Sequence, residues 1–510
     1  MRILPLVAAL LLGAAPAVAQ RTLTLATATA PTVLDPHFHN SAANNQATQH
    51  LFDALAHEDT QGAMRPGLAA SWRVVDDMTW EFTLRAGVRF HDGTPFRATD
   101  VAFSIARVPL VPNSPGPFTS YVRSIATVEV VDETTVRIRT SYANPFLDRE
   151  LSLIMLLSER LHADMRTPDF ATRAIGTGPY RLVSFVPGER MVMEKNPAWF
   201  REPQPWDRAE LRFVTNAGAR MATLLAGEVD GIDAVPPSDV QRLAGDPRLA
   251  VVSIPSYAIV YLFPDSMRET APFVTGRDGA PIANPFRDPR VRRVLSLAVN
   301  RAALAERLLA GGAVPVEQLA SATMVERPQA MPPLAYDPDA ARRLLAEAGY
   351  PDGFRVTLHG PSGYYAGDEA SLQAVAQFLT RAGIATSVEV IPAAPFFTRA
   401  ARQEFGLFMM YYSNPLTPNA LRQLVSTGAP FNRQKYSDAE LDQHIARAMT
   451  TMDAGARQQA TDAAMARLID QMGVVPLVAL RHAWAMRRDR ATYEPSPLGR
   501  TQAMLARPAQ

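Results

Sequence analysis

A histidine beside an aspartate is the first pair in the sequence that could perform chemistry. His91 and Asp92 lie in the stretch FHDGTPFRATDVAFSI, which runs from Phe90 to Ile105. An imidazole next to a carboxylate can act as a general base, but it needs a nucleophile or a metal ion within reach. The neighbouring sequence supplies neither group, and we therefore interpret the pair as part of a turn.

The elements that position this pair favour the same structural interpretation. A strand continues to Phe90, Asp92-Gly93 has the chemistry of a turn, and Pro95 cannot continue a central strand. Thr99 is placed to act as the N-cap of a helix that follows. At such a strand-turn junction, we expect the imidazole of His91 to satisfy backbone groups of the turn.

Two further histidines, His37 and His39, suggest a metal site. On an extended segment, this spacing places both rings on one face of the chain. Two imidazoles are an incomplete site, however, and the sequence identifies no third ligand. We expect no metal site and no cofactor in the protein itself, while contact between His39 and a bound metal chelate or haem stays open.

Motifs for catalysis are absent from the sequence. It contains no Gly-x-Ser-x-Gly, no His-Glu-x-x-His, and no Ser-x-x-Lys in a catalytic context. It also has no cysteine, which excludes a thiol nucleophile and a cysteine-ligated metal. We predict that the protein is not an enzyme and has no catalytic residues. A secreted hydrolase is the disfavoured alternative from another class.

The first nineteen residues have the features of a secretory signal peptide. Arg2 precedes an apolar run from Ile3 to Leu12, and Ala17-Val18-Ala19 forms a small-x-small cleavage site. The apolar run is shorter than the ~20 residues that span a bilayer, and the cleavage site has no cysteine for a lipid anchor. We expect residues 1–19 to be removed and the mature chain to lie in the periplasm with no direct membrane anchor.

Charge and length constrain the partners and the organisation of the chain. Lysine and arginine total 51 against 50 acidic residues, so no basic surface for nucleic acid is indicated. A length of 510 residues predicts two or three domains. Because no low-complexity linker or internal repeat divides the chain, we expect interwoven domains. We also expect a monomer.

Hairpins dominate the first half of the sequence, and helices alternate with strands in the second half, which favours the α/β class. Alternating apolar residues and turn residues mark the hairpins, while Asp-Pro pairs mark the helix starts. Hairpins are predicted around Asp76-Asp77, Asp132-Glu133 and Pro187-Gly188. Helices are predicted after the N-caps Asp288 and Asp337 and over 370–382. Strands are predicted at 21–27, 354–360 and 385–392.

A longer stretch carries a family resemblance. LAASWRVVDDMTWEFTLRAGVRFHDGTPFRATDVAFSI, from Leu68 to Ile105, resembles the fingerprint of the family 5 extracellular solute-binding proteins, the peptide-, nickel- and opine-type binding proteins of ABC importers. Further blocks similar to this family follow in order at 176–200, 288–301, 336–354, 436–449 and 474–480. The resemblance covers essentially the whole mature chain.

This resemblance implies an α/β, two-lobed periplasmic binding protein fold with an extra inserted domain and a hinge between the lobes. The implied boundaries are 20–45, 176–265 and 476–510 for lobe one, 46–175 for the inserted domain, and 266–475 for lobe two. The implied function is capture of a peptide or peptide-like small solute between the lobes, followed by delivery to the transmembrane subunits of an ABC permease.

Three segments match the ligand-lining segments of the family. They supply aromatic rings that can sandwich a ligand, and hydroxyl, amide and imidazole groups that can orient it. The implied ligand-binding residues are His39, Asn40 and Ser41 in the first segment, Tyr257 in the second, and Tyr411, Tyr412 and Asn414 in the third. The alternative for Tyr411 and Tyr412 is a buried strand end.

The sequence departs from the dipeptide-binding members at two positions. They place an aspartate after the strand that matches FMMYY, whereas this chain has Ser413 and Asn414 and no acid until Asp438. They also place an arginine in the segment that matches 359–369, where this chain has none. Dipeptides held by these two groups are not expected. Larger or modified peptides, opines and metal chelates stay open, as does a chaperone or sensor with the same fold.

Overall fold

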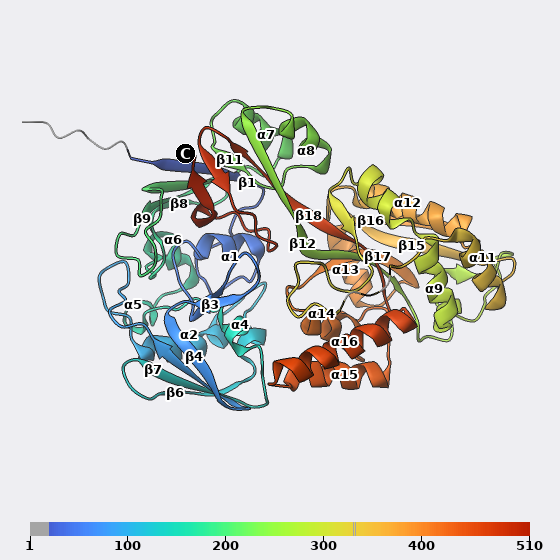
Figure 1. The fold of residues 1–510 in the computed structure, drawn as a ribbon, viewed down its shortest axis with the longest axis horizontal. Helices are drawn as coiled ribbons and strands as arrows, with labels where there is room; N and C mark the ends of the chain where they lie inside the picture. Colours follow the sequence, from blue (N-terminus) through green and yellow to red (C-terminus); the bar gives the residue numbers. More distant parts are fainter. Residues whose placement is uncertain (1–19, 330, 332, 510) are drawn as a thin grey trace, which may run out of the picture.

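A long mixed β-sheet runs through the molecule and connects its two lobes (Figure 1). The structure is a computed structural model that describes residues 20–509 apart from 330 and 332, so the predicted signal peptide lies outside the described residues. Among these residues the sheet has twelve strands in the order β13-β15-β17-β12-β18-β11-β1-β10-β9-β8, with β14 on β18 and β16 on β15. Helices accompany the sheet in both lobes, which confirms the predicted α/β class.

Lobe one contains the amino-terminal strand and the carboxyl-terminal end of the chain. β1 pairs in parallel with β10 and β11, and β8, β9 and β10 form an antiparallel edge. Its elements are β1 (Thr22–Thr27), α1 (Ala42–Thr48), α5 (Glu159–His162), α6 (Phe170–Arg173), β8 (Tyr180–Val186), β9 (Arg190–Lys195), β10 (Arg208–Phe213), α7 (Ala217–Leu225), β11 (Gly231–Ile232), α8 (Pro237–Ala244), β19 (Ala491–Tyr493) and β20 (Ala506–Pro508).

A separate four-stranded antiparallel sheet, in the order β4-β5-β7-β6, lies below lobe one in Figure 1. It has its own hydrophobic core, whose buried residues run from Leu55 to Leu156 and include Trp80 and Phe82. Its region contains β2 (Ala56–Glu58), β3 (Met64–Pro66), β4 (Ala69–Asp76), β5 (Thr79–Leu84), α2 (Ala98–Arg107), α3 (Thr119–Val122), β6 (Ile125–Val130), β7 (Thr135–Thr140) and α4 (Leu147–Leu151). The residue boundaries given above for the lobes and the inserted domain stay a prediction.

Lobe two packs helices against its part of the long sheet and buries two hydrophobic clusters. Its elements are β13 (Val274–Thr275), α9 (Pro289–Ala298), α10 (Arg301–Ala303), β14 (Ala313–Pro315), α11 (Pro338–Glu347), β15 (Arg355–Ser362), α12 (Asp368–Arg381), β16 (Ala385–Pro392), α13 (Ala393–Ala401), β17 (Leu407–Ser413), α14 (Thr417–Val425), α15 (Ala439–Thr450) and α16 (Ala454–Gln471). In the described part of the chain, no helix has the length and apolar character that crossing a membrane requires.

Two long strands, β12 (Leu249–Pro264) and β18 (Val475–Arg487), connect the lobes (Figure 1). They pair with each other in both lobes, but the register is interrupted between Pro255 and Ile259. Within the interruption, the Ser256 hydroxyl donates to the Leu480 carbonyl (2.9 Å) and accepts from the Ala258 amide (3.1 Å). Because such an irregularity bends a strand pair, this point forms the hinge.

The predicted hairpins and helix starts are confirmed by the strand registers and caps. The Asp288 carboxylate accepts from the Arg290 amide (2.8 Å), and the Asp337 carboxylate accepts from the Ala340 amide (2.8 Å). These bonds satisfy amides that the first helical turn leaves without partners.

The predicted N-cap Thr99 is wrong, because α2 begins at Ala98 and its N-cap is Arg97, two residues earlier than predicted. Arg97 has the extended backbone of the N-cap position, and its amide donates to the Asp100 carboxylate (2.8 Å). The carboxylate in the first turn therefore anchors the helix start.

His91 has the structural role that the sequence predicted. Its Nδ1 accepts from the Gly176 amide (3.2 Å), and its Nε2 bonds the Gly178 carbonyl (3.1 Å). Burial lowers the pKa of His91 to about 4, which keeps the ring neutral. The Asp92 carboxylate accepts from the amide and hydroxyl of Thr94 (3.0 and 2.6 Å), as expected for a turn.

His91→Ala should lower the free energy of unfolding by about 1–3 kcal/mol. The substitution leaves the buried Gly176 amide without its acceptor, and the Gly178 carbonyl keeps only the Asn196 side-chain amide as a donor (3.0 Å). Urea unfolding at pH 7.5 measures the difference. Arg89→Ala, at an exposed neighbouring position, is the control and should change stability much less. Equal effects of the two substitutions would contradict the structural role.

Candidate ligand-binding site

Tyr257 lies at the hinge and connects β12 to the inserted domain. Its side chain is only 2% exposed, and its hydroxyl donates to the Glu58 carboxylate (3.1 Å). The same carboxylate forms an ion pair with Arg149 (2.9 Å), whose guanidinium also donates to the Gly62 carbonyl (2.8 Å). Burial, followed by the charge of Glu58, raises the pKa of Tyr257 far above its usual range, so the hydroxyl stays a donor.

The predicted residues of lobe one have different local partners. The Asn40 amide donates to the Tyr121 hydroxyl (3.1 Å), which brings a second tyrosine to this wall. Ser41 is the N-cap of α1 and accepts from the Asn44 amide (3.3 Å). The His39 ring bonds the Thr32 hydroxyl (3.3 Å). Ser41 therefore holds the helix, while Asn40 positions a ring.

The predicted residues of lobe two lie where β17 emerges from the core. Burial ends after Met410, and the side chains of Tyr411 and Tyr412 are half-buried, so they are not a fully buried strand end. The Tyr411 ring stacks on Tyr364 with centroids 4.2 Å apart. The Asn414 side chain donates to the Tyr412 hydroxyl (3.4 Å) and accepts from the backbone amide of Leu416, just before α14 (3.0 Å).

The two walls influence each other electrostatically. Burial raises the pKa of Tyr412, and the Tyr121 hydroxyl of the inserted domain raises it further, while Asn414 and Arg422 act in the opposite direction. Burial likewise lowers the pKa of Arg500. The charge of Glu58 and the hydroxyls of Tyr121 and Tyr257 act in the opposite direction and raise this pKa. Tyr121 thus affects the pKa values of groups from both lobes, Tyr412 and Arg500.

Several residues of this environment were missed at the sequence level. They are the rings and guanidiniums that pack beside the predicted tyrosines, namely Tyr121, Tyr364, Phe397, Phe431, Arg433 and Arg500. The Tyr364-Tyr365 pair after a predicted strand was a visible signal. Arg433 and Arg500 gave none, because both lie in irregular segments without a periodic pattern, and Arg500 contacts Gln49 at the other end of the chain.

The expected arrangement of His37 and His39 is wrong. Residues 36–38 form a turn rather than an extended segment, and the buried His37 ring bonds the Met155 carbonyl (2.8 Å). The two imidazoles therefore have separate partners. Residues 20–509, as far as described, contain no group of three or more histidine or acidic side chains that could hold a metal ion.

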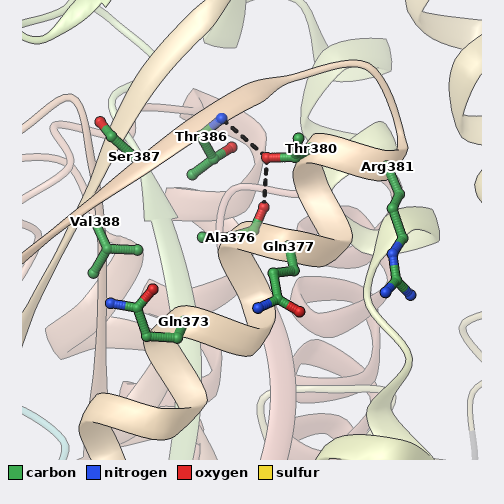
Figure 2. A pocket seen from close by; sticks show the side chains of 8 residues that line it. All are labelled: Gln373, Ala376, Gln377, Thr380, Arg381, Thr386, Ser387 and Val388. Carbon is green, nitrogen blue, oxygen red and sulfur yellow. Dashed lines mark hydrogen bonds between the residues drawn. The ribbon is translucent and has the colours of Figure 1, made fainter.

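Two cavities lie elsewhere, beside α12 and β16 in lobe two. Figure 2 shows the smaller one, of about 430 Å³, between Gln373 and Gln377 of the helix and Val388 of the strand. The other measures about 580 Å³. Thr380 lines both cavities, and its hydroxyl already donates to the Ala376 carbonyl (2.9 Å) and accepts from the Thr386 amide (3.2 Å). None of the seven predicted ligand-binding residues lines either cavity.

Glu150 is the acid of this region whose protonation depends most on its surroundings. Burial raises its pKa from 4.5 to about 7, against the lowering effects of Asn144, Arg422 and Arg123. The Asn144 amide donates to its carboxylate (2.7 Å). Because the folded pKa is raised, the stabilising contribution is complete below pH 4.5 and is lost as the pH rises through about 7.

Glu150→Gln should therefore raise the free energy of unfolding at pH 8 by about 1–3 kcal/mol, because glutamine resembles the protonated acid. The gain should disappear near pH 4.5. Urea unfolding at both pH values measures it. Glu133→Gln, at the exposed turn of the β6–β7 hairpin, is the control. A gain that is equal at the two pH values would contradict the assignment.

Comparison with known proteins agrees with this architecture. Residues 63–432 match the family model described as bacterial extracellular solute-binding proteins, family 5 Middle. The glutathione-binding protein GsiB of Salmonella choleraesuis (strain SC-B67) is 29% identical over 466 residues, which cover 87% of this chain and 86% of that protein.

Solved structures share the fold. HbpA2 from Haemophilus parasuis aligns with a TM-score of 0.84 at 22% identity, over 96% of this chain and all (100%) of that chain. The periplasmic binding protein DppA from Helicobacter pylori, in complex with the peptide STSA, aligns with a TM-score of 0.75 at 20% identity, over 96% and 99% of the two chains. Since the family match spans well over half of the sequence, the chain belongs to the family 5 bacterial extracellular solute-binding proteins.

Proposed function

We propose that the protein is the periplasmic substrate-binding component of an ABC importer. It captures a peptide or peptide-like solute between its lobes and delivers it to the transmembrane subunits of the permease. The observation that carries this proposal is the hinge, where β12 and β18 join the two lobes and the Tyr257 hydroxyl of β12 donates to Glu58 of the inserted domain (3.1 Å).

The chemistry of the walls supports a peptide as the ligand. Tyr411, Tyr412 and Tyr364 offer aromatic faces, and Asn40 and Asn414 carry amides close to these walls. Aromatic faces with a few polar groups are typical of small-molecule sites. The relatives support the same class, since one is named for glutathione and another was solved with a peptide.

The hinge supplies the mechanism of capture. A ligand that contacts both walls binds the closed arrangement more tightly than the open one, and it shifts the population by that difference in affinity. No covalent bond has to change. In this structure Arg457 of α16 packs over the Phe146 ring (5.3 Å), so a direct contact also joins the two sides of the hinge away from the candidate site.

The residue after β17 does not supply an anionic partner for the amino terminus of a peptide. Asn414, near the position where dipeptide-binding members have an aspartate, is a neutral amide already bonded to the Leu416 backbone (3.0 Å). An ammonium buried there would lack an anionic partner, which is strongly unfavourable. An opine or metal chelate remains the alternative within this transporter class.

Mass spectrometry of small molecules released from protein purified out of a native-like periplasm tests the proposal directly. A retained peptide, or a peptide-like solute, is the expected result, because tight ligands stay bound through purification. An opine or a chelate in the released fraction would replace the peptide while keeping the transporter role. Turnover of generic esters or peptides would instead support the hydrolase.

Tyr412→Ala should weaken binding of glutathione about 10- to 100-fold, equivalent to about 1.4–2.8 kcal/mol, because it removes a ring from one wall. Asn414→Ala should weaken it about 3- to 10-fold through loss of the bond that orients Tyr412. Titration calorimetry measures both. The control is Tyr336→Ala, which removes an exposed ring that packs on Phe378. Unchanged affinity in both variants would remove the end of β17 from the site.

A further inference from the structure

Arg433 is a cation of lobe two that forms no ion pair with any residue that the structure describes. Its guanidinium carbon lies 5.5 Å from the ring centroids of Phe397 and of Phe431. Its Nε and Nη1 atoms are buried and have no hydrogen-bond acceptor in the described structure. Phe397 packs on Tyr364 (4.9 Å) and Phe431 on Tyr412 (5.5 Å), so Arg433 lies among the rings of the candidate site.

Arg500 has the corresponding position on lobe one. Its guanidinium donates to the Gln49 amide oxygen (2.9 Å), and no carboxylate among the described residues lies within the 4.0 Å of an ion pair. The groups that act on its charge are Glu58 and the hydroxyls of Tyr121 and Tyr257. Gln49 is the C-cap of α1, the helix that begins at Ser41, so this contact places Arg500 against the wall of lobe one that carries Asn40 and Ser41.

The carboxylates near the candidate site do not neutralise the positive charges of Arg433 and Arg500. Glu58 is engaged by Arg149 (2.9 Å). Arg422, a third arginine of the region, acts on Glu150, and burial raises the pKa of this carboxyl group to about 7, so it is only partly ionised near neutral pH. Arg422 itself donates to the Asn419 side chain (2.7 Å), and its buried Nε has no acceptor. The candidate site therefore carries an excess of positive charge.

Unpaired guanidiniums at a partly buried site favour an anionic ligand. Removing a cation from water is unfavourable unless a counter-charge and hydrogen bonds compensate it. The planar guanidinium matches a carboxylate in two parallel hydrogen bonds, which are among the strong ones in proteins. An aromatic ring against the guanidinium, as at Arg433, holds it in one orientation.

We propose that the ligand is an acidic peptide with at least two carboxylates, one bound by Arg433 of lobe two and the other by Arg500 of lobe one. The inference rests on the proposed function and deepens it. Because the two arginines lie on opposite sides of the hinge, such a ligand forms ion pairs with both lobes and selects the closed arrangement. Peptides without acidic side groups have only one carboxylate and satisfy one arginine.

Titration calorimetry with three probes of similar size tests the charge requirement. The probes are glutathione, which has two carboxylates, glutathione esterified at both carboxylates, and the tripeptide Ala-Ala-Ala. We expect glutathione to bind at least 30-fold more tightly than either other probe, and its affinity to fall as salt is raised. Tight binding of the diester or of Ala-Ala-Ala at the glutathione level would overturn the inference and leave peptide capture intact.

Substitutions of Arg433 and Arg500 test whether each arginine binds a carboxylate of the ligand. Arg433→Gln and Arg500→Gln should each weaken glutathione binding at least 30-fold while affecting the diester less than 3-fold, and Arg433→Lys should recover only part of the loss. Arg355→Gln, at an exposed position of β15 beside the larger cavity, is the matched control. Equal losses for glutathione and its diester would show a structural role for the arginines and contradict the assignment.

Thermal unfolding of each variant separates loss of a contact from loss of the fold. Since an unpaired cation is unfavourable in the free protein, Arg433→Gln should unfold at the same temperature as the original chain or higher. If a variant does not fold, the probe series on the original chain still decides the charge requirement. If no peptide probe of any charge binds, the proposed function itself fails, and the acidic ligand with it.

Discussion

The interrupted pairing of β12 and β18 is the constraint on which the rest of the structure depends. The two strands carry one sheet through both lobes, so the lobes cannot separate without breaking backbone hydrogen bonds. At the interruption, the ladder is missing and the Ser256 hydroxyl supplies a local substitute. The paired stretches on either side resist sliding, while the strand pair can bend where the ladder is interrupted, which is the motion that a two-lobed binding protein requires.

The hinge also decides which side chains meet. Tyr257 lies within the interruption of the ladder, and its hydroxyl reaches Glu58 of the inserted domain. The ion pair between Glu58 and Arg149 satisfies that carboxylate, so a polar cluster at the base of the site is compatible with burial. From this base, the tyrosines of the two walls extend into a common environment in which some cations still lack partners.

Many residues that could perform chemistry instead hold the scaffold together. His91 bonds two glycine backbone groups, His37 bonds a carbonyl, and Ser41 caps a helix. The physical reason is general, because a buried polar group that lacks a partner destabilises the fold by more than most contacts stabilise it. Groups that remain without a partner beside the hinge are consequently more informative about a ligand than residue type alone.

The sequence by itself determined the α/β class, the hairpins, the N-caps at Asp288 and Asp337, the turn at His91, and membership of the family through long matching blocks. These features depend on residues close together in the chain, where turn chemistry and periodicity act directly. It misplaced the start of α2 because Thr99 is a favoured N-cap residue type, whereas the helix starts after Arg97, whose amide donates to the Asp100 carboxylate.

Only the tertiary structure decided which residues share the candidate site. Tyr121, Tyr412, Arg433 and Arg500 come from segments separated by tens to hundreds of residues, and no periodicity relates them. The sequence excluded an arginine from 359–369, yet the fold places Arg433 among rings that include Tyr364 of that segment. Local patterns set each element, whereas burial and the crossing of β12 and β18 set which elements face each other.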